Sequence, residues 1–372
     1  MTTEILTLPH GSLSDSAPPQ NSGHIMLSHK NNFDFLRLLA AFMVLFSHQH
    51  NLLGIPEAHF DPRITPGPLG VAIFFSISGY LVIQSWERDP HVFRFALKRF
   101  LRIWPGLFVV TMLAACAIGP IVSALPAEKY FTDPGFIHYL NNLRLRITVE
   151  LPGVFAANPY PRAVNGSTWS IPFEVRWYFI LSIAGLLTCL RHRRIILIAV
   201  IVLAIYQFGI YHAETNADRN WGREYGLYFC IGTLMWLYRD LWQARKLLVA
   251  VISVAAGTLA YVFGQHLLAE LIVIAPLTLL LGSSSTPILR QFGRFGDLSY
   301  GVYIYAFMVQ QTLIWAIGPT ASFSLHLALT VTITLACAFV SWHCIEKPAL
   351  ALKKASGWPL SGRMSRRLLR AD

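Results

Sequence analysis

The chain has 372 residues, of which 54% are hydrophobic and only 13% charged, and its mean hydropathy is positive. This composition excludes a soluble domain with a charged surface and indicates wide exposure to lipid. The net charge of +11 does not indicate nucleic-acid binding, because the basic residues lie in segments that flank apolar stretches. The five cysteines have no CxxC spacing, so we expect neither a metal centre nor a disulfide framework.

Apolar stretches recur from Phe33 almost to the C-terminus, and a membrane span needs about 20 such residues. They predict an all-α polytopic membrane protein with one transmembrane domain at 32–348. We expect the polar residues 1–31 to form a disordered tail, and residues 349–372 to form a basic tail that lies on anionic lipid. The predicted helices are 33–53, 68–86, 104–124, 169–190, 194–212, 224–238, 247–264, 267–282, 298–317 and 325–346.

Lysine and arginine are distributed unequally between the two sides of these ten helices. One side carries 21 of the 30 Lys and Arg residues, and the other carries seven. Because basic residues mark the cytoplasmic side, both termini are predicted to be cytoplasmic. The long connection 125–168 then lies on the outer side, and its aromatic, Pro and Gly residues predict an ordered loop.

The first predicted helix carries two ionisable residues, Arg37 and His48, that are costly in lipid. They are eleven residues apart, so on a helix they share one face, offset by about 20° and separated by about 16 Å along the axis. Arg37 lies toward the cytoplasm, where Asp34 can pair with it, and His48 lies toward the outer face. A snorkelling arginine and a packing histidine are the alternative readings. As a functional residue, His48 can serve as a general base on a hydroxyl.

A basic segment from Lys98 to Arg102 leads into the third predicted helix. On a helix Arg99 and Arg102 are neighbours on one face, and two guanidinium groups on one surface suit a phosphate or pyrophosphate. Basic residues at a cytoplasmic helix end are also the default in membrane proteins, so the pattern is not specific by itself.

The fourth predicted helix begins near Trp169 and Ser170 and carries Glu174. Trp169 fits an interfacial aromatic belt and Ser170 fits a helix start, but these structural roles leave the acid at Glu174 unexplained. We expect Glu174 at a depth like that of His48, where its carboxylate orients the imidazole or accepts a hydrogen bond from a sugar hydroxyl.

Four further polar residues have simpler readings. Ser78 lies in a run of small residues where helices pack closely, and Tyr300 and Tyr303 supply hydroxyls for interhelical hydrogen bonds. Glu346 lies just before Pro348, and we expect the last helix to end there.

In their order along the chain these motifs resemble those of the acyltransferase-3 family, membrane proteins that O-acylate bacterial polysaccharides, lipopolysaccharide and related glycans. The resemblance covers Asn32 to Pro348. It rests on Asp34 and Arg37 with His48, FFSISGYL at 74–81, Arg99 and Arg102 with Pro105, Trp169 and Ser170 with Glu174, Ser299 and Tyr300 with Tyr303, and Ile345 to Pro348. Many members have a histidine after the tyrosines of the ninth span, whereas Ala306 and Phe307 follow Tyr305 here.

The resemblance implies transfer of an acyl group, usually acetyl, from cytoplasmic acyl-CoA to a hydroxyl of an extracytoplasmic glycan or lipid-linked glycan, in the inner membrane of a bacterium. It implies His48 as the catalytic base, Arg37 as a donor-side or pore-lining partner, and Arg99 and Arg102 as contacts for the CoA phosphates, with no metal. We therefore assign His48, Arg37 and Glu174 to catalysis and Asp34, Ser78, Trp169, Ser170, Tyr300, Tyr303 and Glu346 to support.

Two other classes of function are compatible with the sequence. A secondary transporter or flippase would use Arg37, His48 and Glu174 as a proton relay, and internal symmetry with broken helices would favour it. A non-catalytic scaffold for polysaccharide assembly leaves the buried Arg and His without a role. For an acyltransferase, the sequence does not distinguish direct transfer from an acyl-enzyme relay, nor does it identify the sugar, its hydroxyl or the acyl chain.

Overall fold

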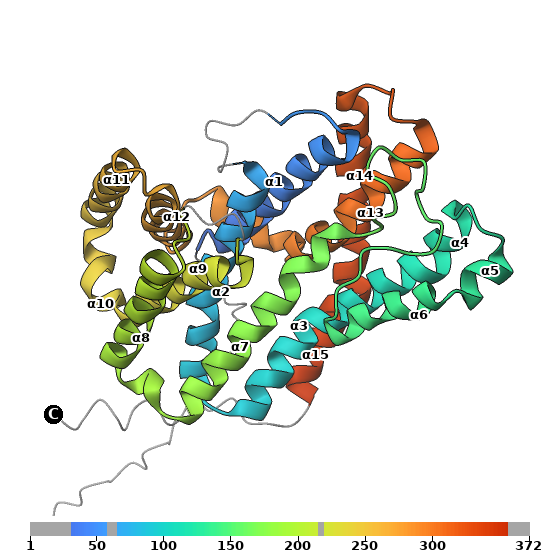
Figure 1. Cartoon of the computed structure of the whole chain (residues 1–372). Helices are drawn as coiled ribbons and strands as arrows, with labels where there is room; N and C mark the ends of the chain where they lie inside the picture. The colour runs from blue at the N-terminus through green and yellow to red at the C-terminus, as the bar shows by residue number, and fades with distance from the viewer. Residues whose placement is uncertain (1–30, 58–64, 215–218, 356–372) are drawn as a thin grey trace, which may run out of the picture.

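A computed structural model of the chain describes residues 31–57, 65–214 and 219–355 (Figure 1). The described residues form helices, turns and two isolated β-bridges, so the all-α prediction is confirmed. All ten predicted helices are present. They are α1 (Phe33–Leu53), α2 (Pro66–Arg88), α3 (Val92–Met112), α7 (Ile171–Leu186), α8 (Arg193–Ile205), α9 (Trp221–Leu237), α11 (Lys246–Val262), α12 (His266–Gly282), α13 (Ser299–Ile317) and α14 (Phe323–Ser341).

Shorter segments extend or connect these ten helices. They are the π-helical η1 (Leu113–Ile118), α4 (Gly119–Val122), α5 (Ala127–Thr132), α6 (Pro134–Leu140), η2 (Asn141–Arg144), η3 (Gly166–Ser170), η4 (Cys189–Arg191), η5 (Tyr206–Ile210), α10 (Arg239–Trp242), η6 (Gln243–Arg245), η7 (Leu289–Phe295), η8 (Trp342–Glu346) and α15 (Lys347–Ala355).

Several helical stretches are long and apolar enough to cross a membrane, which confirms a polytopic membrane protein. In the part of the chain that the structure describes there are five: Pro66–Arg88, Val92–Val122, Arg193–Ile210, Arg239–Val262 and Phe323–Lys353. In α2, 61% of the most apolar window is buried inside the protein, against 6% in the stretch formed by α8 and η5 and 11% in that containing α11. The first is therefore central, and the other two present apolar side chains to lipid.

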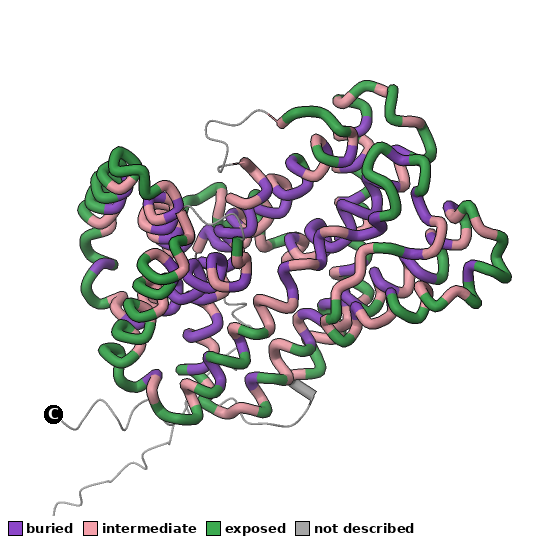
Figure 2. The backbone as a smooth tube through the Cα atoms, in the orientation of Figure 1, coloured by how far each residue is buried: buried purple, intermediate pink, exposed green. Residues whose placement is uncertain are grey.

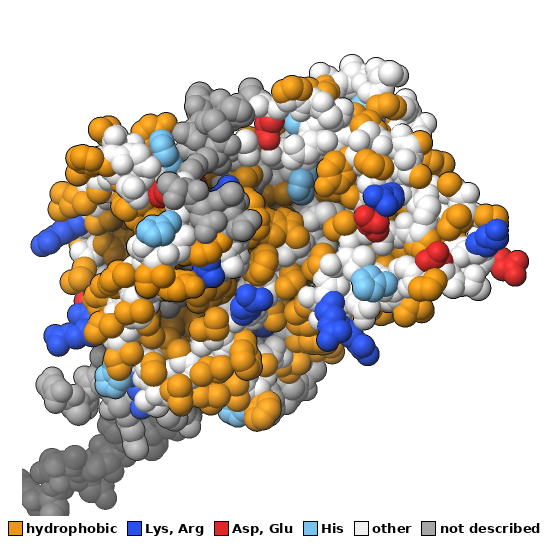
Figure 3. All heavy atoms as spheres, in the orientation of Figure 1, with side chains coloured by type: hydrophobic (Ala, Val, Ile, Leu, Met, Phe, Trp, Pro, Cys, Tyr) orange, Lys and Arg blue, Asp and Glu red, His pale blue; other side chains and the backbone are white. Residues whose placement is uncertain are grey.

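The figures show this arrangement directly. Helices α8 and α11 lie at one edge of the molecule and are mostly exposed, whereas buried residues gather where α1, α2, α9 and α13 meet (Figures 1 and 2). Hydrophobic side chains cover most of the face that carries α7 and α8 (Figure 3). Helices α2 and α9 approach so closely that a Cβ atom on Gly79 would collide with the carbonyl oxygen of Phe229.

The third helix begins well before the predicted residue 104, so the basic segment lies inside α3 instead of in a loop. Asp89 makes this possible, because its carboxylate accepts a hydrogen bond from Arg94 Nε at 2.9 Å and one from Lys98 Nζ at 2.7 Å. The hydrogen bond from Arg94 lowers the pKa of Asp89 to about 2 despite partial burial, so the carboxylate stays charged at neutral pH. The first turns of α3 thereby lose much of their excess charge.

The last helix was predicted to end just before Pro348, but it continues through η8 and α15 to Ala355. The π-helical turn η8 changes the hydrogen-bond register directly before Pro348, which lets the helix accommodate a proline. The predicted basic tail at 349–372 therefore begins inside α15, and the rest of it, like residues 1–30, lies outside the described residues.

The connection 125–168 is ordered, as predicted. It contains α5, α6, η2 and η3, and it buries Tyr130 and Tyr139 against the ends of the bundle. This loop lies at the end of the bundle that carries His48, which we call the histidine end. The opposite end, which carries Arg37, Arg99 and Arg102, we call the basic end.

Candidate active site

His48 lies in the last two turns of α1 and faces η3 and α13. Its Nδ1 is 3.4 Å from the hydroxyl oxygen of Ser167, and its ring meets the edge of Phe307 with centroids 5.1 Å apart. Among the described residues no group is hydrogen-bonded to Nε2. In the tautomer that has its proton on Nδ1, the Nδ1–H group donates a hydrogen bond to the Ser167 hydroxyl. Nε2 then carries a lone pair and can serve as a base.

Ser167 is held in place by the start of η3. Asn165 caps this segment, since its side-chain oxygen accepts a hydrogen bond from the Ser167 amide at 3.2 Å, while its Nδ2 donates to the Ile304 carbonyl of α13 at 2.8 Å. Ser167 is fully buried. The hydroxyl that meets His48 therefore sits on a capped turn that is fixed to α13.

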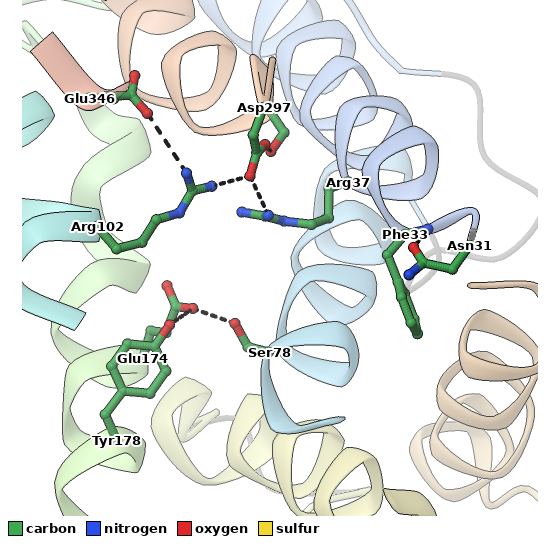
Figure 4. A network of polar contacts seen from close by, with 10 residues as sticks. Asn31, Phe33, Arg37, Ser78, Arg102, Glu174, Tyr178, Asp297 and Glu346 are labelled. Atoms are coloured by element: carbon green, nitrogen blue, oxygen red, sulfur yellow. Dashed lines mark hydrogen bonds and ion pairs between the residues drawn. The ribbon is translucent and has the colours of Figure 1, made fainter. Parts of the chain in front are cut away.

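Glu174 does not orient His48, because the contact at Nδ1 comes from Ser167. Its alternative role, accepting a hydrogen bond from a sugar hydroxyl, stays a prediction. The carboxylate of Glu174 instead accepts hydrogen bonds from the hydroxyls of Ser78 and Tyr178 (Figure 4). Glu174 lies on the predicted helix but faces Ser78 and Tyr178, whereas the Asn-Gly-Ser turn before the helix is the sequence signal that points to Ser167.

A line of polar side chains follows one face of η3 and α7 from the histidine end into the bundle. Its members, which we call the polar stripe, are Ser167, Ser170, Glu174 and Tyr178. Their spacing of three or four residues places them on one side of a helix. The stripe faces α2 and α13, since Ser78 reaches Glu174 and the Tyr303 hydroxyl lies 2.7 Å from that of Ser170.

Arg99 stands where the polar stripe reaches the basic end. Its guanidinium carbon is 5.7 Å from the ring centroid of Tyr178 and 5.8 Å from that of Phe95. Among the described residues, its buried Nε has no hydrogen-bond partner and no carboxylate forms an ion pair with it. Helix α15 packs against α3 and carries Lys353. This corner is therefore rich in basic residues.

Arg102 has different surroundings, although it lies on the same face of α3 as Arg99. Its guanidinium is 2.5 Å from Asp297 Oδ2 and 3.9 Å from Glu346 Oε2, and Arg37 meets the same Asp297 oxygen at 2.5 Å (Figure 4). We call Arg37, Arg102, Asp297 and Glu346 the charge network. Burial alone would raise the pKa of Asp297, but Arg102 and Arg37 outweigh this and lower it below its usual range.

The charge network corrects two expectations. The ion pair of Arg37 is made with Asp297, while the carboxylate of Asp34 lies against Gly293 of η7. Arg99 and Arg102 do not offer two unpaired guanidiniums to one phosphate, because Arg102 is already engaged by Asp297, just before α13, and by Glu346 of η8. Asp297 was not among the predicted site residues, although an acid in an otherwise basic connection just before Ser299 is a detectable signal.

The other predicted residues support the site from its edges. The Tyr300 hydroxyl donates a hydrogen bond to the Ile103 carbonyl at 2.7 Å, which ties α13 to α3. Trp169 packs against Trp221 with ring centroids 5.8 Å apart, in an aromatic cluster at the histidine end. Glu346 is almost fully buried in the charge network.

Comparison with known proteins identifies the family of the chain. Residues 30–343 match the family model described as an acyltransferase domain, of the acyltransferase-3 type. The chain is 30% identical over 334 residues to the O-acetyl transferase of Shigella phage Sf6, covering 86% of this chain and 96% of that protein. It is 31% identical over 361 residues to nodulation protein 10 of Rhizobium leguminosarum bv. viciae, covering 87% and 94%. No solved structure matches. The chain therefore belongs to the acyltransferase-3 family of membrane O-acyltransferases.

Proposed function

We propose that the chain moves an acyl group, most simply acetyl, from acyl-CoA at the basic end to a glycan hydroxyl at the histidine end, in the inner membrane of a bacterium. The observation that carries the proposal is the polar stripe, which runs between His48 and Arg99. Within the described part of the chain, neither His48 Nε2 nor Arg99 Nε has a hydrogen-bond partner. An O-acetyl transferase among the relatives supports acetyl as the group transferred.

His48 supplies the base in this proposal. Nε2 removes the proton from the acceptor hydroxyl as the oxygen attacks the thioester carbonyl carbon, while Ser167 keeps the imidazole oriented through Nδ1. The carbon–sulfur bond then breaks, and the imidazolium returns the proton to the departing thiolate. The products are the O-acyl glycan and free CoA.

Arg99 is the better of the two arginines for a CoA phosphate. Its buried Nε has no hydrogen-bond partner among the described residues, whereas the guanidinium of Arg102 is already engaged by Asp297. Phosphate oxygens form charge-assisted hydrogen bonds that satisfy such a guanidinium. The hydroxyls of Ser170 and Tyr303 lie further along the stripe and can meet the amide groups of the donor's extended arm.

The proposal is tested by acetyl-ester content of the cell's surface polysaccharide, measured by NMR in strains that produce His48→Ala at normal protein level. We expect the acetyl signal to disappear. His343→Ala is the matched control, because His343 is exposed near the basic end and its Nδ1 hydrogen-bonds the Phe339 carbonyl of the preceding turn, so acetylation should persist. Normal acetylation in the His48→Ala strain would contradict the assignment of the base. Transfer of labelled acetyl from acetyl-CoA by purified protein separates an enzyme from a transporter.

A further inference from the structure

Helix α13 carries two consecutive glutamines, Gln310 and Gln311, whose side chains are completely buried one turn beyond Phe307. We propose that they are positioning residues that fix the two sides of the contact between His48 and Ser167. Gln310 holds the turn of α1 that carries His48, and Gln311 holds the loop that leads to Ser167. The inference rests on the proposed role of His48 as the base.

The amide of Gln310 anchors α1 directly beside His48. Its Nε2 donates to the Leu45 carbonyl at 2.8 Å and to the Gln49 side-chain oxygen at 3.1 Å. The Thr330 hydroxyl of α14 donates to that same oxygen at 3.2 Å. Residues 45 and 49 lie on either side of His48, so these bonds fix both the height and the rotation of the turn.

The amide of Gln311 anchors the opposite wall. Its Nε2 donates to the carbonyls of Tyr160 and Ala163 at 2.8 and 2.7 Å, and its side-chain oxygen accepts from Asn158 Nδ2 at 2.8 Å. This segment leads within two residues to Asn165, which caps the turn of Ser167. The hydrogen bonds of Gln311 thus fix the position of the loop along α13, and with it the position of Ser167 relative to His48.

One turn of α13 therefore holds both the segment of α1 that carries His48 and the loop that leads to Ser167. Consecutive residues on a helix point about 100° apart, which is why neighbouring amides can reach α1 and the loop at the same time. Phe307 adds a third contact on this turn, because its ring meets His48 and also covers Gly166, where a Cβ would have no room.

A role in packing alone explains this pair poorly. The amide of Gln311 is fully engaged, since its Nε2 donates twice and its oxygen accepts once. In the part of the chain that the structure describes, Gln310 Oε1 is buried without a hydrogen-bond partner, which costs free energy. Leucine at either position would fill a similar volume, but the carbonyls of Leu45, Tyr160 and Ala163 would lose these donors. The directional bonds that the two amides donate therefore explain the glutamines better than the volume that they fill.

The test measures acetyl transfer by purified Gln310→Leu and Gln311→Leu proteins. We expect kcat to fall about 10- to 100-fold, since a displacement near 1 Å costs up to about 100-fold. KM for acetyl-CoA should stay within twofold, because the donor binds at the basic end. Gln207→Leu is the matched control, since Gln207 is equally buried, accepts a hydrogen bond from Arg223 and lies on η5 away from His48. It should leave kcat unchanged.

Two further measurements separate positioning from general loosening. In a Ser167→Ala background the two leucine variants should lower kcat less than twofold further, because the contact that they align is already gone. The same factor in both backgrounds, or an unchanged kcat in the single variants, overturns the inference. If Gln310→Leu does not fold, Gln310→Asn is compared instead, since its shorter amide should lose the bond to Leu45. Should His48→Ala retain activity, the proposed function itself fails, independently of the glutamines.

Discussion

Replacing Asp297 by Asn tests whether the charge network holds the basic end together. The network contains Arg37 and Arg102 against Asp297 and Glu346, so the substitution leaves one uncompensated positive charge and two facing guanidiniums. Breaking a buried ion pair costs about 3–5 kcal/mol. The side chains of Arg37 and Asp297 keep 20% and 16% exposure, which relieves part of the cost, so we expect a loss of about 3 kcal/mol.

The assay is thermal unfolding of detergent-purified protein followed by tryptophan fluorescence. Asp297→Asn should lower Tm by several degrees, and adding Arg37→Met should recover part of the loss, because the second change removes the uncompensated charge. Asp240→Asn is the matched control, since its ion pair with Arg193 is exposed on both sides, and Tm should barely change. A wild-type Tm for Asp297→Asn, or a further drop on adding Arg37→Met, refutes the reasoning.

Three other outcomes follow from the structure. Ser167→Ala should lower kcat about tenfold at constant KM for acetyl-CoA, because the imidazole loses its orienting hydrogen bond, and an unchanged kcat in steady-state assays would count against it. Arg99→Gln should raise KM for acetyl-CoA about 10- to 100-fold, because a hydrogen bond to a charged group contributes about 1.5–3 kcal/mol. Arg102→Gln should chiefly lower Tm, because it removes a member of the charge network. Reversed effects of the two variants would contradict this division of roles. Gly79→Ala should prevent stable folding in the membrane, since the added Cβ has no room beside α9. Gly209→Ala should be tolerated, because the atom nearest to its added Cβ is 3.9 Å away. The amount of each protein in the membrane fraction is measured, and equal amounts would contradict the prediction.

The helices of this protein follow from local sequence. Each of the ten stretches is apolar over most of its length, and lipid forces such a backbone to satisfy its own hydrogen bonds as a helix. The eleven-residue spacing of Arg37 and His48 is likewise a property of one helix, and the structure places both toward α13. The order of the motifs was enough to indicate the acyltransferase-3 family, which the comparison confirms. The cytoplasmic location of the termini stays a prediction.

Only the tertiary structure decided which polar groups meet. Arg37 pairs with Asp297, 260 residues away in the chain, and His48 meets Ser167, 119 residues away. A buried charge or imidazole takes whichever partner the packed helices bring within hydrogen-bond distance, and helical spacing within one segment carries no information about that. For the same reason Arg99 and Arg102 differ in their surroundings, although they are neighbours on one face of α3. Of the acids in the described residues, Asp297 and Glu346 form ion pairs with Arg102 and none does so with Arg99.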